Sequence, residues 1–293
     1  MPEYPDVTVY IEAIERHALG HILESVKLNT PFLLRTYQPP IDSLCRQTLT
    51  GVRRMGKRIA FGFSNGHWMA LHLMIAGRLH WNSRRQALAV FSFDNGALSL
   101  TEAGTRRQAA LHLFTSEAEL AAIDAGGLEV MTATLEAFTA RLTASNHTLK
   151  RALTDPRILS GIGNAYSDEI LHHARLSPVT LTQKLSADEI HRLLASIRDR
   201  LNYFTQSLRD QTGAGFPEKV TAFRPEMAVH GKYKEPCPNC ATPIQRIVHA
   251  SNETNYCPTC QTCGKLLADR ALSRLLGKDW PKSLEEMELR KRL

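Results

Sequence analysis

Apolar and polar residues alternate with different spacings along the chain, and the spacings divide it into parts. Residues 7–19 carry apolar side chains at helical spacing, which predicts a first helix. From residue 20 to about 93, short apolar or alternating runs end in Gly or Asn turns, as at 59–66 and 88–96, a pattern typical of strands. We therefore expect a helix followed by an antiparallel β-sandwich over residues 1–115.

Helical spacing returns between residues 116 and about 211. The predicted helices cover residues 132–142, 149–153, 163–174 and 187–208. Ser186 with Glu189 three residues later is a capping-box start for the last of these helices. The Gly-rich stretch 212–216 predicts a loop, and the charged segment 264–293 has helical potential.

Five of the six cysteines lie between residues 237 and 263. Cys237 with Cys240, and Cys257 with Cys260, form two C-x2-C pairs separated by 16 residues. Each pair can supply two thiolates to a tetrahedral Zn²⁺, and four thiolates leave no open position for water, so we expect one structural zinc ribbon. A disulfide framework is the alternative, but it is uncommon in a cytoplasmic protein. Cys263 is expected to stand outside the site, and exchange of its sulfur with a ligand of the site is the alternative.

The composition is that of a globular protein, with 43% hydrophobic and 22% charged residues. The longest nearly apolar stretch, 68–77, is ten residues long, and a membrane helix needs ~20. The N-terminus has acids and prolines where an export signal would have basic and then apolar residues. The sequence therefore predicts no membrane partner and a cytoplasmic location.

The net charge of +7 is unevenly distributed. Between Asp42 and Asp94 there is no acidic residue. The same stretch holds eight bases: Arg46, Arg53, Arg54, Lys57, Arg58, Arg78, Arg84 and Arg85. This basic stretch favours a surface that binds a polyanion, and a solvated basic face is the alternative.

The N-terminal residues offer a nucleophile. Pro2 follows Met1, and a small second residue favours removal of the initiator methionine, which would expose a secondary amine. An α-amino group titrates near ~8, so part of it is neutral at cellular pH and can attack an aldehyde-level carbon. Glu3 beside it can transfer a proton. Pro-Glu at a terminus is common, so the pair alone does not establish such chemistry.

Four motifs in order resemble those of the formamidopyrimidine-DNA glycosylase/endonuclease VIII family. They are residues 1–7 (MPEYPDV), residues 53–57 (RRMGK), residues 159–169 (LSGIGNAYSDE) and the two cysteine pairs, ending in residues 257–261 (CPTCQ). In the family they are the catalytic N-terminus, a hairpin with a catalytic lysine, a helix–two-turns–helix motif and a zinc finger.

The resemblance implies an enzyme that flips a damaged nucleotide out of double-stranded DNA, because the sugar carbon is inaccessible inside the stack. Pro2 would attack C1′ and displace the base, Glu3 would protonate the opening sugar, and Lys57 would hold a phosphate. The Schiff base would then break the strand by β- and δ-elimination. Asp6 stands where the family usually has glutamate.

The third motif implies contacts to the DNA backbone. Residues 161–164 predict a turn that opens a helix, and exposed amides at a helix start bind phosphate. The amide of Asn164 can donate a further hydrogen bond, and Lys150 matches a family position that faces DNA. An ordinary helix start is the alternative for this turn.

Two loops depart from the family pattern. Ile75 stands where many members place an intercalating methionine, so Leu73, Met74 or Ile75 is the candidate wedge. A buried strand end is the alternative. Residues 106–109 read RRQA, which keeps Arg106 as the probe of the opposite base but lacks the aromatic residue and glycine of the formamidopyrimidine branch. This departure favours the endonuclease VIII-like branch.

The zinc hairpin departs as well, because Asn252 stands where the family has an arginine. Loss of a charge-assisted phosphate contact would weaken DNA binding by about 1.5–3 kcal/mol. Glu253 adds a charge of the same sign as phosphate, while Arg246 or His249 could compensate. The tail beyond residue 263 either contacts DNA or packs on the protein.

We therefore predict an α+β multidomain protein. Its parts are an N-terminal catalytic β-sandwich domain (1–115), a helix–two-turns–helix domain (116–225), a four-cysteine zinc finger (226–263) and a charged, helical tail (264–293). The predicted function is a monomeric, nucleoid-associated, bifunctional DNA glycosylase/AP lyase of base excision repair, acting on duplexes with oxidised bases or abasic sites. The alternatives are a damaged- or structured-DNA-binding member with little catalysis, and a zinc-ribbon factor without lesion preference. The sequence leaves the preferred lesion and opposite base open.

Overall fold

The computed structural model describes residues 1–83, 85–103, 107–217, 220–221, 223–249, 252–268 and 275–291. Arg106, predicted to probe the opposite base, lies outside the described residues. The chain forms two compact units, and each is composed of two segments. The first unit is Met1–Gly127 with Leu201–Ala222, and the second is Leu128–Arg200 with Phe223–Leu293.

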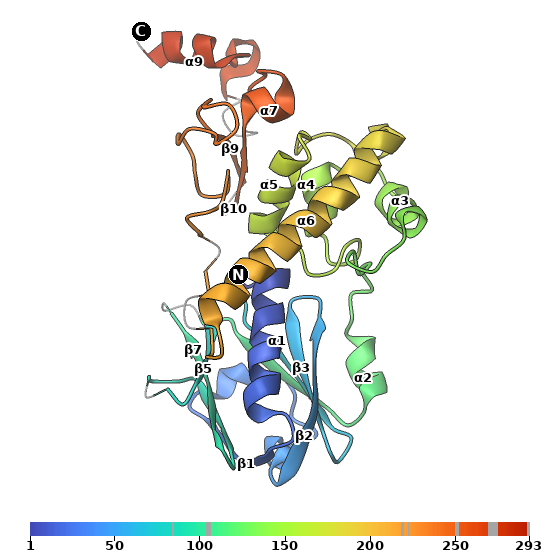
Figure 1. Cartoon of the computed structure of the whole chain (residues 1–293), viewed down its shortest axis with the longest axis vertical. Coiled ribbons are helices and arrows are strands. Elements are labelled where there is room, and N and C mark those ends of the chain that lie inside the picture. The colour runs from blue at the N-terminus through green and yellow to red at the C-terminus, as the bar shows by residue number, and fades with distance from the viewer. Residues whose placement is uncertain are drawn as a thin grey trace. The chain divides into compact units, whose positions relative to one another are not determined.

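The first unit begins with helix α1, Tyr4–Ala18 (Figure 1). It starts earlier than residue 7 because Pro5 occupies the first turn, where a missing N–H is tolerated and a fixed φ fits the helix. The apolar face of α1 buries Val7, Tyr10 and Ile14 against the strands.

Eight antiparallel strands make up the sheet of this unit in the order β5-β7-β6-β1-β2-β3-β4-β8. They are β1 (Ile22–Leu28), β2 (Gln47–Met55), β3 (Arg58–Phe63), β4 (Trp68–His72), β5 (Gly77–Trp81), β6 (Ala89–Phe93), β7 (Gly96–Glu102) and β8 (Ala110–Phe114). β1 pairs with β2 only near its start, at Ile22 and Leu23, and with β6 along the rest of its length. The sheet therefore divides at β1 into two four-stranded halves. One cluster of buried residues draws on both halves and on α1, as the predicted β-sandwich requires.

Short elements join these strands. They are the 3-10 helices η1 (Pro31–Leu33) and η2 (Ile41–Leu44) and the helix α2 (Glu117–Ala122). The sequence pattern did not predict α2, which Ser116 caps by accepting a hydrogen bond from the Glu119 N–H.

The second unit is mostly helical. Its elements are α3 (Leu135–Thr143), α4 (Leu149–Thr154), α5 (Asn164–His173), η3 (Thr182–Lys184), β9 (Gln245–His249), β10 (Asn252–Tyr256), α7 (Pro258–Thr262), η4 (Gly277–Asp279) and α9 (Leu284–Lys291). Helix α6 (Ala187–Thr212) begins here, and its residues from 201 onward belong to the first unit. These helices match the predicted segments closely. The predicted helical tail is helical in its described part only at η4 and α9.

None of the helices in the described ranges is long and apolar enough to span a membrane.

Candidate active site and zinc centre

The start of α1 holds the predicted nucleophile and acid inside the protein. Pro2 is buried, and Glu3 is only 2% exposed. Glu3 is the N-cap of α1, and its backbone N–H donates to Oδ2 of the buried Asp6 over 2.9 Å. The shorter carboxylate of Asp6 thus holds the peptide group next to Pro2 in place.

The hairpin between β2 and β3 carries Lys57 at its tip. Met55 pairs with Arg58, which leaves a two-residue turn of Gly56 and Lys57, and Gly56 has the positive φ (+60°) that such turns need. Arg54 donates to the Gly56 carbonyl over 2.9 Å, and its guanidinium lies 4.4 Å from the ring centroid of Tyr4. A cation–π contact therefore joins this hairpin to the first residue of α1.

The chain's amino group lies in the electrostatic field of these residues. Burial lowers the pKa of the Met1 amino group below its ordinary value. Arg78 and Lys57 lower this pKa as well, whereas Glu3 and Asp6 raise it. The structure thus brings Lys57 to the amino terminus and adds Arg78, which the sequence placed only within the basic stretch.

The loop between β4 and β5 carries the candidate wedge. Leu73 is 1% exposed and packs in the core, whereas Ile75 is 65% exposed. Met74 is half-buried with a positive φ of 51°. Arg78 donates to the carbonyl of Ile75 over 3.3 Å and steadies the turn. Burial removes Leu73 from the candidates because an intercalating side chain must be accessible, and it leaves Ile75 as the most exposed of the three.

In the second unit, helix α5 presents a row of polar side chains to residues 226–263, which contain the four predicted zinc ligands and which we call the zinc module. Asn164 donates its side-chain N–H to the carbonyl of Glu253 in β10 over 3.0 Å. One turn later, the fully buried Asp168 accepts from Lys150 Nζ at 2.5 Å and pairs with Nδ1 of His230 at 2.8 Å. Asn164, Asp168 and His172 follow one another at intervals of four residues, so their side chains lie on one face of α5.

Lys150 and Asn164 thus have partners within this unit. The Lys150 side chain is 14% exposed, and Nζ also donates to the Asn164 carbonyl over 2.7 Å. Contact of either residue with DNA stays a prediction.

Glu169 anchors the first residues of the zinc module. Its carboxylate, 3% exposed, accepts from the backbone N–H groups of residues 228, 229 and 230 over 2.8 to 2.9 Å. Burial raises the pKa of Glu169, and the three backbone hydrogen bonds oppose that rise. The sequence signalled Asp168 and Glu169 only as parts of the motif, and it carried no signal for His230, 62 residues away from Asp168.

The four predicted zinc ligands come together. The sulfur atoms of Cys237, Cys240, Cys257 and Cys260 all lie within 4.8 Å of one another. The separations of 3.4, 3.5 and 3.9 Å match the roughly 3.8 Å that tetrahedral geometry with Zn–S bonds of about 2.3 Å requires. The buried Nε2 of His172 lies 3.3 Å from the Cys237 sulfur, within reach to donate to a metal-bound thiolate. The donor set fits one structural Zn²⁺, and the exposed Cys263 stands outside it.

The hairpin of β9 and β10 carries Asn252 at the exposed start of β10. Arg246 pairs with Glu253 at 3.0 Å and lies 4.3 Å from the ring centroid of Tyr233. The carboxylate predicted to repel phosphate is thus neutralised within the module. The side chain of His249 lies outside what the structure describes.

The first residues of the tail contact the zinc module. Leu267 donates its backbone N–H to the hydroxyl of Tyr256 over 2.8 Å, and Leu266 is buried. This favours the packing alternative for residues 265–268.

Three family models match the chain. The formamidopyrimidine-DNA glycosylase N-terminal domain matches residues 1–115, the formamidopyrimidine-DNA glycosylase H2TH domain matches 128–213, and the zinc finger found in FPG and IleRS matches 234–262.

Relatives of known sequence agree with these models. A formamidopyrimidine-DNA glycosylase of Rickettsia massiliae is 28% identical over 274 residues, which cover 89% of this chain and 97% of that protein. An uncharacterized formamidopyrimidine-DNA glycosylase-like protein of Mycobacterium tuberculosis is 38% identical over 138 residues, covering 46% of this chain and 84% of that protein.

Solved structures are similar over most of the chain. The MutM (Fpg) protein of Thermus thermophilus gives a TM-score of 0.76 at 27% identity, covering 89% of this chain and 98% of that one. Lactococcus lactis Fpg bound to DNA containing an oxidized pyrimidine gives 0.76 at 25% identity, covering 89% and 100%. With the three matched domains in order and the zinc ligands assembled, the chain belongs to the formamidopyrimidine-DNA glycosylase family.

Proposed function

We propose that this DNA glycosylase is bifunctional, excising oxidised bases and cutting the strand at the resulting abasic site. The observation that carries the proposal is the buried Pro2–Glu3 pair in the field of Lys57 and Arg78. A nucleophilic amine, an acid and two cations at one place are the groups that such a reaction needs.

Removal of Met1 would make Pro2 the reacting amine. The burial and the cations that lower the pKa of the Met1 amino group would act on the Pro2 nitrogen too, and would keep more of it neutral. This nitrogen would bond to C1′ as the bond from C1′ to the base breaks, and the base would leave with the electron pair and take up the proton that the nitrogen loses. Glu3 would protonate the ring oxygen as the sugar opens. The iminium would acidify C2′, so that loss of its proton expels the 3′ phosphate and a second elimination expels the 5′ phosphate.

We assign the DNA backbone to both units. Lys57 would hold a phosphate beside the lesion, and Asn164 with Lys150 would hold another. Ile75, with Met74 beside it, would fill the gap left by the flipped nucleotide. Arg106 would face the opposite base, and Asn252 would make a weaker backbone contact than arginine.

The assignment to one branch of the family rests on the departures from the family pattern. Gln108 and Ala109 stand where the formamidopyrimidine branch has its aromatic residue and glycine, and their backbone N–H groups donate to Glu102. We therefore propose an endonuclease VIII-like enzyme that works as a monomer on duplex DNA in the bacterial nucleoid. The proposed domains are residues 1–115, 116–225, 226–263 and 264–293.

Borohydride trapping on a duplex with one abasic site tests the proposal. The wild type should form a covalent complex, Pro2→Gly should form none, and Pro5→Ala should still form it. Failure of the wild type to be trapped or to cut the strand would overturn the proposal. Cleavage of a panel of lesions against each opposite base would then define the substrate.

A second candidate is a member of the family that binds damaged or structured DNA with little catalysis. Asn252 at an exposed hairpin position favours it, because an amide replaces a cation. Tight binding of the abasic duplex without trapping would select this candidate, and equal affinity for intact and abasic duplexes would select a factor without lesion preference.

A further inference from the structure

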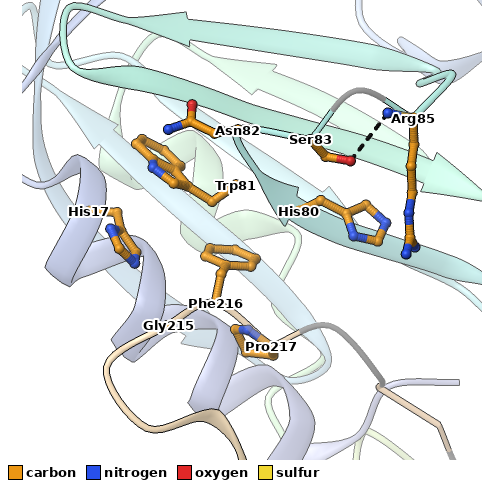
Figure 2. Close-up of a pocket in the computed structure, with 9 residues that line it drawn as sticks. All are labelled: His17, His80, Trp81, Asn82, Ser83, Arg85, Gly215, Phe216 and Pro217. Atoms are coloured by element: carbon orange, nitrogen blue, oxygen red, sulfur yellow. Dashed lines mark hydrogen bonds between the residues drawn. The ribbon is translucent and has the colours of Figure 1, made fainter.

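A cavity lies in the first unit, away from the start of α1. It has a volume of about 360 Å³ and is bounded by α1, the end of β5 and the loop after α6 (Figure 2). Six of its lining residues give it its chemical character: His17, His80, Trp81, Ser83, Arg85 and Phe216. Of the residues that the sequence singled out for polyanion binding, only Arg85 lines it among the described residues, and neither Pro2, Glu3 nor Lys57 does. Its volume is within the range of small-molecule pockets, about 300–1,000 Å³.

Aromatic rings form one wall of this cavity. The ring of His17 stacks on Trp81 with centroids 5.3 Å apart, and it lies 6.2 Å from the ring of Phe216. Phe216 also contacts Tyr10 at 5.9 Å, which ties the loop after α6 to α1. A Cβ at Gly96 would lie only 2.6 Å from the Trp81 ring, so glycine makes room for the indole. The rings are therefore held in place as a platform rather than left free on the surface.

Polar groups lie toward the other end of the cavity. His80 is 7% exposed and its Nε2 contacts the hydroxyl of Thr101 at 2.8 Å. Arg85 donates its backbone N–H to the hydroxyl of Ser83 over 3.2 Å, and its side chain lines the same cavity as His80 (Figure 2). A cation at one end and an aromatic wall at the other match a flat heterocycle that carries an anionic group.

His17 carries one unsatisfied polar atom beside this cavity. Its Nε2 atom is buried, and among the described residues it has no hydrogen-bond partner. A buried polar atom without a partner is costly, so such atoms usually meet a ligand or a bound water.

We propose that this cavity is a nucleotide-binding site, in which a base stacks on the Trp81–Phe216 wall and its phosphate pairs with Arg85. Strand β5 joins it to the candidate active site, because Arg78 and His80 are two residues, roughly 7 Å, apart on the same strand face. The nucleotide can be free in solution or belong to an unpaired stretch of DNA. The site goes beyond the proposed function, which does not require it.

Calorimetric titration of the full-length, zinc-loaded protein with dAMP tests the proposal. The wild type should bind saturably, and Trp81→Leu should raise the Kd about five- to hundredfold, as the loss of one stacking contact predicts. Arg85→Gln, which changes an exposed loop and spares the core, should raise it as well. Trp68→Leu is the matched control, because it removes a tryptophan of the same unit outside the cavity, and its Kd should equal that of the wild type. Deoxyribose 5-phosphate, which lacks a base, should bind far more weakly.

Competition then identifies the source of the nucleotide. A single-stranded oligonucleotide that displaces dAMP at a much lower concentration assigns the site to DNA, and equal potency assigns it to free nucleotides. Absence of saturable dAMP binding, or equal Kd values for the wild type, Trp81→Leu and Arg85→Gln, would overturn the proposal. Trapping of the wild type on an abasic duplex reports on the proposed function alone, so the two can fail separately.

Discussion

Asp168 is the buried charge on which the α5–zinc module contact depends. Its carboxylate is 0% exposed and is shared by Lys150, His230 and, at 3.4 Å, Asn255. Asp168→Ala would leave the Lys150 ammonium nearly buried, with the Asn164 carbonyl as its one remaining acceptor among the described residues. Removing one partner of a buried pair costs about 3–5 kcal/mol. Since Lys150 keeps one acceptor and some exposure, we expect about 3 kcal/mol.

Hydrogen exchange followed by mass spectrometry provides the assay, because it reports the opening free energy of α5 and β10 separately from the first unit. Glu235→Ala is the matched control. It breaks an ion pair with Lys232 in the same unit, but the Glu235 side chain is 55% exposed, so the loss should stay below about 1 kcal/mol. The double variant Lys150→Met/Asp168→Leu should recover much of the loss, because it removes both charges. An Asp168→Ala effect no larger than that of Glu235→Ala would refute the reasoning.

Three further predictions concern the wedge, the pH dependence and the metal. Ile75→Ala should change the free energy of unfolding by less than about 0.5 kcal/mol and should weaken binding of an abasic duplex. Leu73→Ala should lower the free energy of unfolding by about 2–5 kcal/mol in urea titrations. If Ile75→Ala binds the abasic duplex as tightly as the wild type, Ile75 is excluded as the wedge. Burial, with nearby cations, lowers the pKa of His72 to about 4 in the folded protein. As the pH falls, the unfolded chain therefore protonates His72 before the folded protein does, and protonation favours unfolding. The contribution of His72 to stability should therefore fall by about 3 kcal/mol as the pH drops from about 6.5 to 4, and a His72→Gln variant with the same pH dependence as the wild type would contradict this. Zinc chelation should speed hydrogen exchange in residues 228–268 and leave strands β1–β8 protected, whereas equal protection with and without zinc would show that the metal does not hold the module.

Much of the fold could be predicted from local patterns. The zinc ligands were fully predictable, because the C-x2-C spacing is set by the metal rather than by distant packing. Helix α1 begins three residues before the predicted start, because the apolar spacing begins only at residue 7, whereas the prolines and acids before it suit a first helical turn.

The partners of the polar side chains could not be predicted. Lys150 and Asp168 are 18 residues apart and meet only because α4 and α5 pack together, so the family resemblance, which has position 150 face DNA, did not indicate this ion pair. Likewise, the Asn164 amide donates to Glu253, 89 residues away. Pattern and spacing assign residues to faces and motifs, but a partner across the fold is decided by tertiary packing.

The central claim is that the amine of Pro2 forms the covalent bond to the sugar. The most direct measurement is the mass of the N-terminal peptide after borohydride trapping on an abasic duplex and digestion of protein and DNA. We expect the reduced sugar adduct on a peptide that begins at Pro2, with Met1 absent. An adduct on Lys57 or another lysine, or an N-terminus that retains Met1 in the trapped protein, would contradict the account.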